Sequence, residues 1–67
     1  MSSKKLGERL RELREYKGMS QQQLAERASV TLGYVVIIEA GQQRPPSRAI
    51  LQRLARALDV AVEKLEE

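Results

Sequence analysis

Helix start and stop signals recur at short intervals along this chain and divide it into five short segments. Gly18 ends the first segment, because glycine readily adopts the left-handed conformation found just past a helix C-terminus. Ser20 begins the second segment, and Gln23, three residues later, completes a Ser-x-x-Gln capping box. The apolar face of the first segment consists of three leucines at helical spacing, Leu6, Leu10 and Leu13. These start and stop signals predict short helices joined by tight turns.

The third segment carries conflicting signals. Thr31 is a good N-cap and Gly41 a good stop, so the two bracket a helix that runs through Ala40. By local propensity, however, residues 34–38 (YVVII) favour a strand. A lone strand would have no partner to pair with, because every neighbouring segment has a helical pattern. We therefore predict a helix in this segment.

The last third of the chain predicts two more helices. The Pro-Pro pair in the polar loop 42–46 forbids helix there, and Ser47 caps the fourth helix. The apolar side chains of that helix repeat at helical spacing: Ile50, Leu51, Leu54, Ala55 and Leu58. Residues 59–61 interrupt the pattern before a short fifth helix. The predicted fold class is all-α with five short helices, in a single domain over residues 1–67.

The absence of cysteine and histidine removes several classes of function. It excludes disulfides, zinc-finger ligation, thiol nucleophiles and imidazole catalysis. No paired carboxylates converge on a predicted cleft, so we expect no enzyme, metal, cofactor or small-molecule substrate. Tyr16 and Tyr34 are the only aromatic residues, too few for a base-stacking platform. No apolar run approaches the ~18 residues of a membrane span, and no secretory signal is visible, so we expect a cytoplasmic protein.

The ordered set of segments resembles the phage repressor/Cro (XRE-like) type of helix-turn-helix domain. The matching stretches are LGERLRELR at 6–14, KGMSQQQLA at 17–25, IEAG at 38–41, the Pro45-Pro46 loop and LARAL at 54–58. The helix-turn-helix unit itself would occupy about residues 20–40. This resemblance implies a lambda-repressor-like fold and a transcription regulator that binds double-stranded DNA as a homodimer. It also implies that the third helix enters the major groove.

The resemblance also implies roles for individual residues. Contacts to backbone phosphate are expected from the start of the second helix and from the loop after the third, at Ser20, Gln21, Gln42, Gln43 and Arg44. Base-reading positions are expected on the third helix at Leu32, Gly33, Val36 and Ile37. Arg14 and Glu39 match a structural ion pair between the first and third helices. The free N–H groups and positive dipole of a helix start suit a phosphate, as does a guanidinium fork.

The third helix departs from this pattern in its chemistry. If Val35 and Ile38 face the core, the remaining side chains lie about 90° to 170° away on a helical wheel and should be exposed. These side chains belong to Leu32, Val36, Ile37 and Gly33. In the family that the chain resembles, such positions usually carry polar residues that read base edges through hydrogen bonds. Residues 29–43 carry a single charge, the negative Glu39, although the whole chain has a net charge of +3.

Three explanations of this apolar face remain open. In the first, the protein contacts DNA mainly through the backbone and thymine methyl groups. Alternatively, the face forms a protein–protein or homodimer interface, as exposed apolar patches often do. The third explanation is a redesigned or laboratory-selected variant in which base reading is weakened or lost. Two further departures predict a cost in stability: Ser29 and Asp59 stand where the family favours glycine, and positive φ is unfavourable for other residues.

Overall fold

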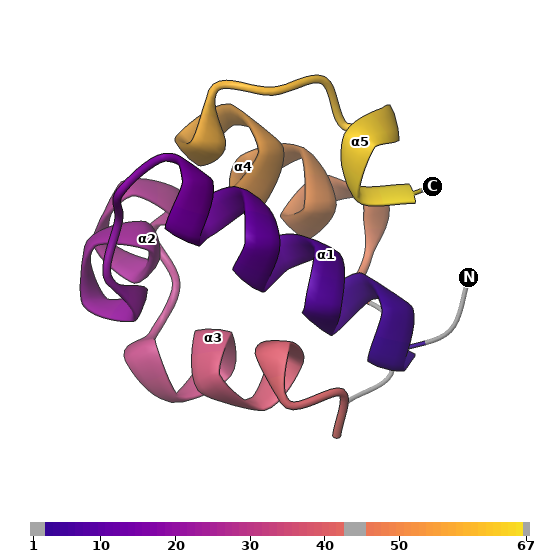
Figure 1. The fold of residues 1–67 in the computed structure, drawn as a ribbon, viewed down its shortest axis with the longest axis horizontal. Coiled ribbons are helices and arrows are strands. Elements are labelled where there is room, and N and C mark those ends of the chain that lie inside the picture. Colours follow the sequence, from indigo (N-terminus) through magenta and orange to yellow (C-terminus); the bar gives the residue numbers. More distant parts are fainter. Residues whose placement is uncertain (1–2, 43–45, 67) are drawn as a thin grey trace.

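The computed structural model describes residues 3–42 and 46–66, and it folds them into five helices with no strand among them (Figure 1). The helices are α1 (Ser3–Tyr16), α2 (Gln21–Ala28), α3 (Leu32–Glu39), α4 (Arg48–Leu58) and α5 (Glu63–Glu66). The predicted all-α fold class is therefore confirmed. The third segment is helical despite its strand propensity, although α3 ends at Glu39 and Ala40 serves as its C-cap, one residue before the predicted end.

The helix ends have the predicted capping bonds. The Gln23 N–H donates to Ser20 Oγ at 3.0 Å, and the Ser20 N–H donates to Gln23 Oε1 at 2.8 Å, so the capping box is complete. Thr31 and Ser47 each accept from the backbone N–H three residues on, at 3.1 and 3.3 Å. Gly18 follows α1 with a φ of 72° and satisfies orphan carbonyls of its last turn.

Two helices end on residues other than glycine in the left-handed conformation. Ser29, with a φ of 58°, caps α2, and Asp59, with a φ of 59°, caps α4. The left-handed conformation lets the N–H of each cap residue, and the N–H of the residue after it, donate to carbonyls in the last turn of the helix. Both positions agree with the prediction that non-glycine residues stand at positive φ.

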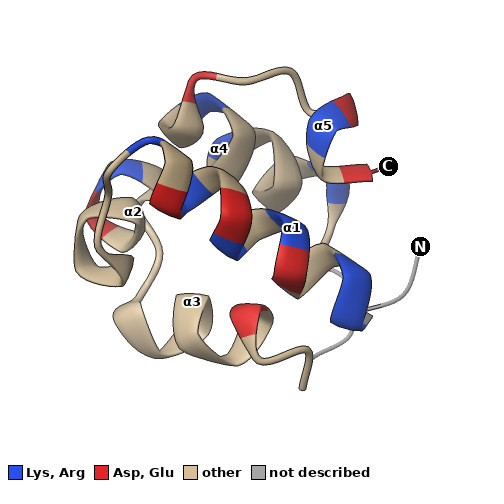
Figure 2. Ribbon diagram, viewed as in Figure 1, with Lys and Arg blue, Asp and Glu red and all other residues tan. Residues whose placement is uncertain are grey.

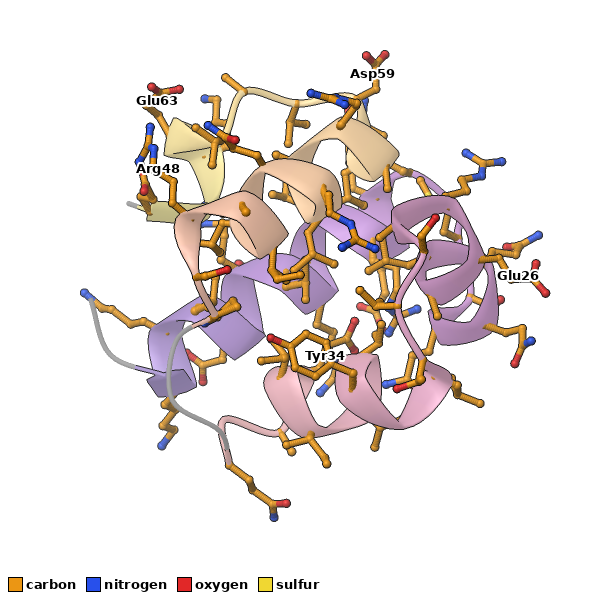
Figure 3. All side chains as sticks on the ribbon, turned by 180° about the vertical axis from the view of Figure 1, so that it is seen from behind. Glu26, Tyr34, Arg48, Asp59 and Glu63 are labelled. Atoms are coloured by element: carbon orange, nitrogen blue, oxygen red, sulfur yellow. The ribbon has the colours of Figure 1, made fainter. Side chains whose placement is uncertain are left out.

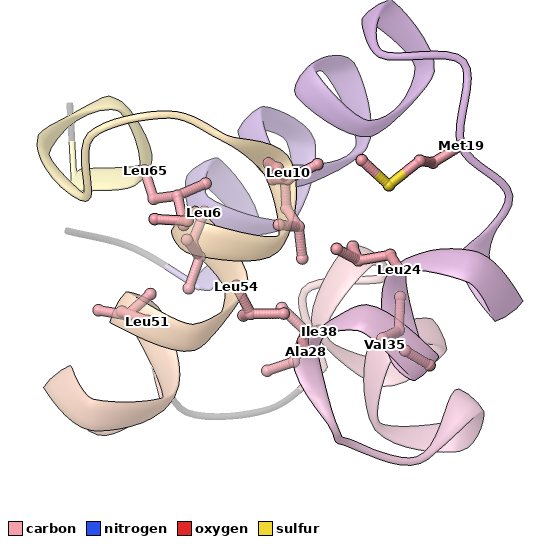
Figure 4. Close-up of a cluster of buried hydrophobic side chains, with 13 residues drawn as sticks. Leu6, Leu10, Met19, Leu24, Ala28, Val35, Ile38, Leu51, Leu54 and Leu65 are labelled. Atoms are coloured by element: carbon pink, nitrogen blue, oxygen red, sulfur yellow. The ribbon is translucent and has the colours of Figure 1, made fainter.

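The helices enclose one apolar core (Figure 4). In Figure 1, α1 crosses the middle of the molecule, with α3 on one side of it and α4 and α5 on the other. Leu10, Leu24, Val35, Leu58 and Leu65 are each fully buried, and between them they come from all five helices. None of the helices among residues 3–42 and 46–66 combines the length and apolar character needed to cross a bilayer.

A single glycine allows α3 to lie close against α1. A Cβ added to Gly7 would lie 2.7 Å from the carbonyl oxygen of Glu39 and closer still to that of Ile38. No side chain larger than hydrogen fits this site unless one of the backbones moves. The backbone of α3 is therefore held against α1, while its opposite side faces away from the rest of the domain.

Candidate nucleic-acid interface

The outward side of α3 is an apolar surface, as the helical wheel predicts. Leu32 and Val36 are each 42% exposed and Ile37 is 36% exposed, whereas Val35 and Ile38 are buried. Gly33, which follows Leu32, is exposed as well, and a Cβ added there would meet nothing within 4 Å. We call Leu32, Gly33, Val36 and Ile37 together the α3 face. It brings together the four positions at which the family resemblance expects base reading.

The α3 face carries no charge of its own. Figure 2 shows a single charged segment on α3, which is Glu39. The Glu39 side chain is only 4% exposed and points inward to α1. Tyr34 is half-buried, and its ring packs against the core on the inner side of α3 (Figure 3). What the face offers a partner is therefore aliphatic surface and bare helix backbone.

A network centred on Glu39 fixes the position of α3. The Arg14 guanidinium donates from Nε to Glu39 Oε2 at 2.6 Å and from Nη2 to Glu39 Oε1 at 3.0 Å. Its third bond, from Nη1 to the Met19 carbonyl at 2.8 Å, holds the turn after α1. The hydrogen bond to Glu39 raises the pKa of Arg14 above its ordinary value, although partial burial acts in the opposite direction. The structure thus brings together the expected ion pair in two-pronged geometry.

Gln21, the first residue of α2, joins the same network. Its Nε2 donates to Glu39 Oε1 at 3.1 Å, so one N–H of its side-chain amide is committed to the ion pair. A phosphate contact from Gln21 would use the other N–H. Sequence reasoning missed this shared role, because the two residues are 18 positions apart and neither has a local signal for the other.

The remaining expected phosphate contacts fall at both ends of the helix-turn-helix unit. Ser20 is exposed at the start of α2, where its Oγ already accepts the capping bond. Gln42 is exposed just past α3, and its backbone N–H donates to the Ile37 carbonyl at 3.2 Å. Gln43 and Arg44 lie outside the described residues.

The fold places charged side chains of α1 beside the α3 face. Arg11 lines a hollow between α1, α2 and α3, together with Val36 at the edge of the α3 face, but its Nε lies 3.4 Å from Oε2 of Glu15, which lines the same hollow. At the other end, a Cβ added to Gly41 would lie 3.0 Å from the Cα of Lys4, so the start of α1 lies beside the end of α3. The α1 charges are therefore balanced at the Arg11 side of the face, and Lys4 brings a positive charge near the end of α3.

A second contact that sequence reasoning missed closes the end of α2. Arg53 of α4 donates from Nε to the Ala28 carbonyl at 3.0 Å and from Nη2 to the Ser29 carbonyl. A cation at the negative end of a helix dipole is favourable, and here the bonds also hold the turn that leads into α3. No sequence pattern pairs Arg53 with residues 24 and 25 positions earlier.

The described part of the chain contains no group of three or more His, Cys, Asp or Glu residues that could hold a metal ion. Within that part, every buried side-chain nitrogen and oxygen has a hydrogen-bond partner. The polar groups that remain to meet a partner are therefore at the surface.

Comparisons with known proteins agree with this geometry. A family model described as a helix-turn-helix domain matches residues 5–67. The HTH-type transcriptional regulator SinR of Bacillus subtilis (strain 168) is 38% identical over 60 residues, which cover 90% of this chain and 54% of SinR. The chain thus spans about half the length of this curated relative.

Two solved structures are also similar. The restriction-modification controller protein C.AhdI from Aeromonas hydrophila has a TM-score of 0.89 and 43% identity, over 94% of each chain. SinR, described as the master regulator for biofilm formation and solved in complex with DNA, has a TM-score of 0.88 and 37% identity, over 92% of this chain and 98% of that one.

Proposed function

This chain belongs to the helix-turn-helix family of the phage repressor/Cro type, and we propose that it binds double-stranded DNA as the DNA-binding part of a transcription regulator. The observation that carries the proposal is the exposure of one whole side of α3, directly after the tight turn that joins it to α2. The similarity to SinR, solved in complex with DNA, supports the same conclusion.

In this proposal α3 lies in the major groove. A helix with its side chains is ~10–12 Å across, and the groove is ~12 Å wide, so the α3 face meets the base edges. Ser20 and Gln21 approach one phosphate strand from the start of α2, where free N–H groups and the helix dipole attract an anion. Gln42, Gln43 and Arg44 approach a phosphate beyond the other end of α3.

The family also supports a finer proposal about assembly and mechanism. Two copies would bind as a homodimer to half-sites ~34–36 Å apart, one turn of the double helix. The domain, residues 1–67, would act in the cytoplasm by occluding a promoter, without catalysis. Sedimentation with and without a two-half-site duplex tests the dimer, since one copy per duplex at saturation would contradict it.

Salt-dependent titration tests DNA binding itself. We expect mixed-sequence duplex DNA to bind at low salt and to weaken as salt rises, because phosphate contacts release counterions. Gln42→Glu should weaken binding about tenfold, since it sets a negative charge against phosphate. Gln52→Glu makes the same change on an exposed position of α4, beside the segment 59–62 that follows that helix, and should change affinity less than about twofold. Absence of binding at low salt, or equal weakening by both variants, would contradict the proposal.

The exposed aliphatic side chains also favour a second candidate function, a protein–protein or homodimer interface through the α3 face. None of the comparisons supports it. Sedimentation of the parent and of the double variant Val36→Ser, Ile37→Gln separates the two. If the parent is a monomer at high concentration in the absence of DNA, the second candidate fails.

A further inference from the structure

Building on the proposed DNA binding, we propose that the α3 face reads the C5-methyl groups of pyrimidines in the major groove. Selection of sequence would then come from apolar contact, in place of hydrogen bonds to base edges. The ligand feature is one methyl group at one position of the pyrimidine ring. Two bases carry it there, thymine and 5-methylcytosine.

The chemistry of the α3 face leaves few other features to read. Leu32, Val36 and Ile37 are aliphatic, so none can donate to or accept from a base edge. Among the base edges in the major groove, the thymine methyl is the apolar one. The polar edge of an unmodified G·C pair would be stripped of water against these side chains without gaining a partner, which is unfavourable. The face therefore favours methyl groups and disfavours bare polar edges.

The spacing of the side chains suits neighbouring base pairs. Leu32 and Val36 are four residues apart on one helix, which separates them by ~6 Å along its axis. Base pairs are stacked ~3.4 Å apart, so the two side chains can reach methyl groups about two steps apart. Gly33, with open space around its missing Cβ, lets the helix backbone come close to the groove floor.

The surroundings of the α3 face favour DNA over a second copy of the chain. A standard protein interface buries ~800 Å² per partner from roughly 20–30 residues, and three partly exposed aliphatic side chains fall well short of that. Glu39, the one charge on α3, is neutralised by Arg14. Lys4 brings a positive charge near the end of α3, and Arg11 at the other side is balanced by Glu15. These groups give the edges of the face no net negative charge, which suits a methyl-lined groove between phosphate strands.

The test compares duplexes of equal length that differ only in methyl groups. Fluorescence anisotropy at fixed low salt would measure affinity for alternating A·T and A·U duplexes, and for alternating G·C duplexes with and without 5-methylcytosine. Burying one methyl corresponds to about fourfold in affinity, so two contacted methyl groups predict about 15-fold tighter binding to A·T than to A·U. Cytosine methylation should tighten binding to G·C by about the same factor per contacted methyl.

Two protein variants locate the effect. The double variant Leu32→Ser, Val36→Ser removes the two spaced aliphatic side chains of the face and should bring the A·T to A·U ratio close to one. Val62→Ser makes the same kind of change outside α3, and Gln42→Ala removes an expected phosphate contact. Both should leave the ratio unchanged, while Gln42→Ala weakens binding to every duplex alike. The comparison of duplexes by the parent protein does not depend on any variant folding.

The outcomes separate this inference from the proposed function. Salt-dependent binding with equal affinity for A·T and A·U duplexes would overturn methyl reading and leave DNA binding in place. A methyl preference that survives in the serine double variant would overturn the assignment to the α3 face, because it would reflect duplex shape. Absence of binding to all four duplexes at low salt would overturn both. Tighter binding to both the thymine and the 5-methylcytosine duplexes would support recognition of the methyl group itself. Tighter binding to the thymine duplex alone would support thymine as the base that supplies the methyl group.

Discussion

Glu39→Gln is the substitution whose effect can be worked out most fully from the structure. It keeps the volume of the side chain and removes one negative charge. The charge lies 2.6 and 3.0 Å from two nitrogens of Arg14, and the two side chains are only 4% and 11% exposed. An amide nitrogen of the new glutamine would face a guanidinium N–H, so at least one of the two bonds is lost. Arg14, nearly buried, then keeps only the exposed Glu15 as a nearby negative charge, with Glu15 Oε2 3.9 Å from Arg14 Nη2.

The expected cost follows from burial. Removing one partner of a buried ion pair costs ~3–5 kcal/mol. Arg14 keeps its bond to the Met19 carbonyl and is slightly exposed, so the expected cost here is about 2–4 kcal/mol. A domain of this length has an unfolding free energy of roughly 3–10 kcal/mol. At ~4–8 °C per kcal/mol, the melting temperature should fall by about 8–32 °C.

Thermal and urea unfolding followed by circular dichroism measure this loss. Glu66→Gln is the matched control, because it breaks the ion pair with Arg48 at the surface. The Arg48 side chain is 60% exposed and that of Glu66 is 31% exposed, so this change should cost less than ~1 kcal/mol. Combining Glu39→Gln with Arg14→Met removes both charges and should cost less than the two single changes together, by about 1–3 kcal/mol. A melting temperature for Glu39→Gln equal to that of Glu66→Gln would refute the reasoning.

Three further predictions concern the backbone and its caps, each measured as a free energy of urea unfolding. Ser29→Gly and Asp59→Gly should each stabilise the fold by about 0.5–1 kcal/mol. The left-handed conformation costs other residues ~1–2 kcal/mol, and the larger chain entropy that glycine loses on folding cancels part of the gain. Destabilisation by both variants would contradict this. Gly7→Ala should cost ~1–3 kcal/mol through overlap with the backbone of α3. Gly33→Ala, in open space on α3, should instead stabilise the fold by about 0.5–1 kcal/mol. Equal effects of the two variants would disprove the close approach of α1 and α3. Arg53→Met should cost about 1 kcal/mol by releasing two carbonyls at the end of α2, and an unchanged urea midpoint would show that these bonds contribute nothing.

Most of the helix boundaries could be predicted because their causes are local. A capping hydroxyl and the N–H three residues on belong to one turn, so Ser20, Thr31 and Ser47 mark their helices directly in the sequence. The third helix was harder, since five strand-favouring residues in a row contradict its caps. The caps were the better guide, and the core agrees with them: residues three apart share one side of a helix but point to opposite sides of a strand, so a helix lets Val35 and Ile38 both be buried.

The candidate site could be predicted only in part. The exposure of Leu32, Val36 and Ile37 follows from the 100° spacing of side chains once the inward face is known. The Arg14–Glu39 pair came from the family resemblance and not from spacing, because 25 residues separate the two. The charged residues beside the α3 face had no signal in residues 29–43, since Arg11, Glu15 and Lys4 come from α1.

The sequence by itself determined the five helices, the inward side of each and the chemistry of the outward side of α3, because these depend on residues within one or two turns. Only the tertiary structure decided what surrounds that side. The contact of α1 with α3 at Gly7, the entry of Gln21 into the ion pair and the capping of α2 by Arg53 all join residues distant in the chain. Such contacts depend on how whole helices pack, and that arrangement leaves the apolar side of α3 exposed as the surface proposed to meet DNA.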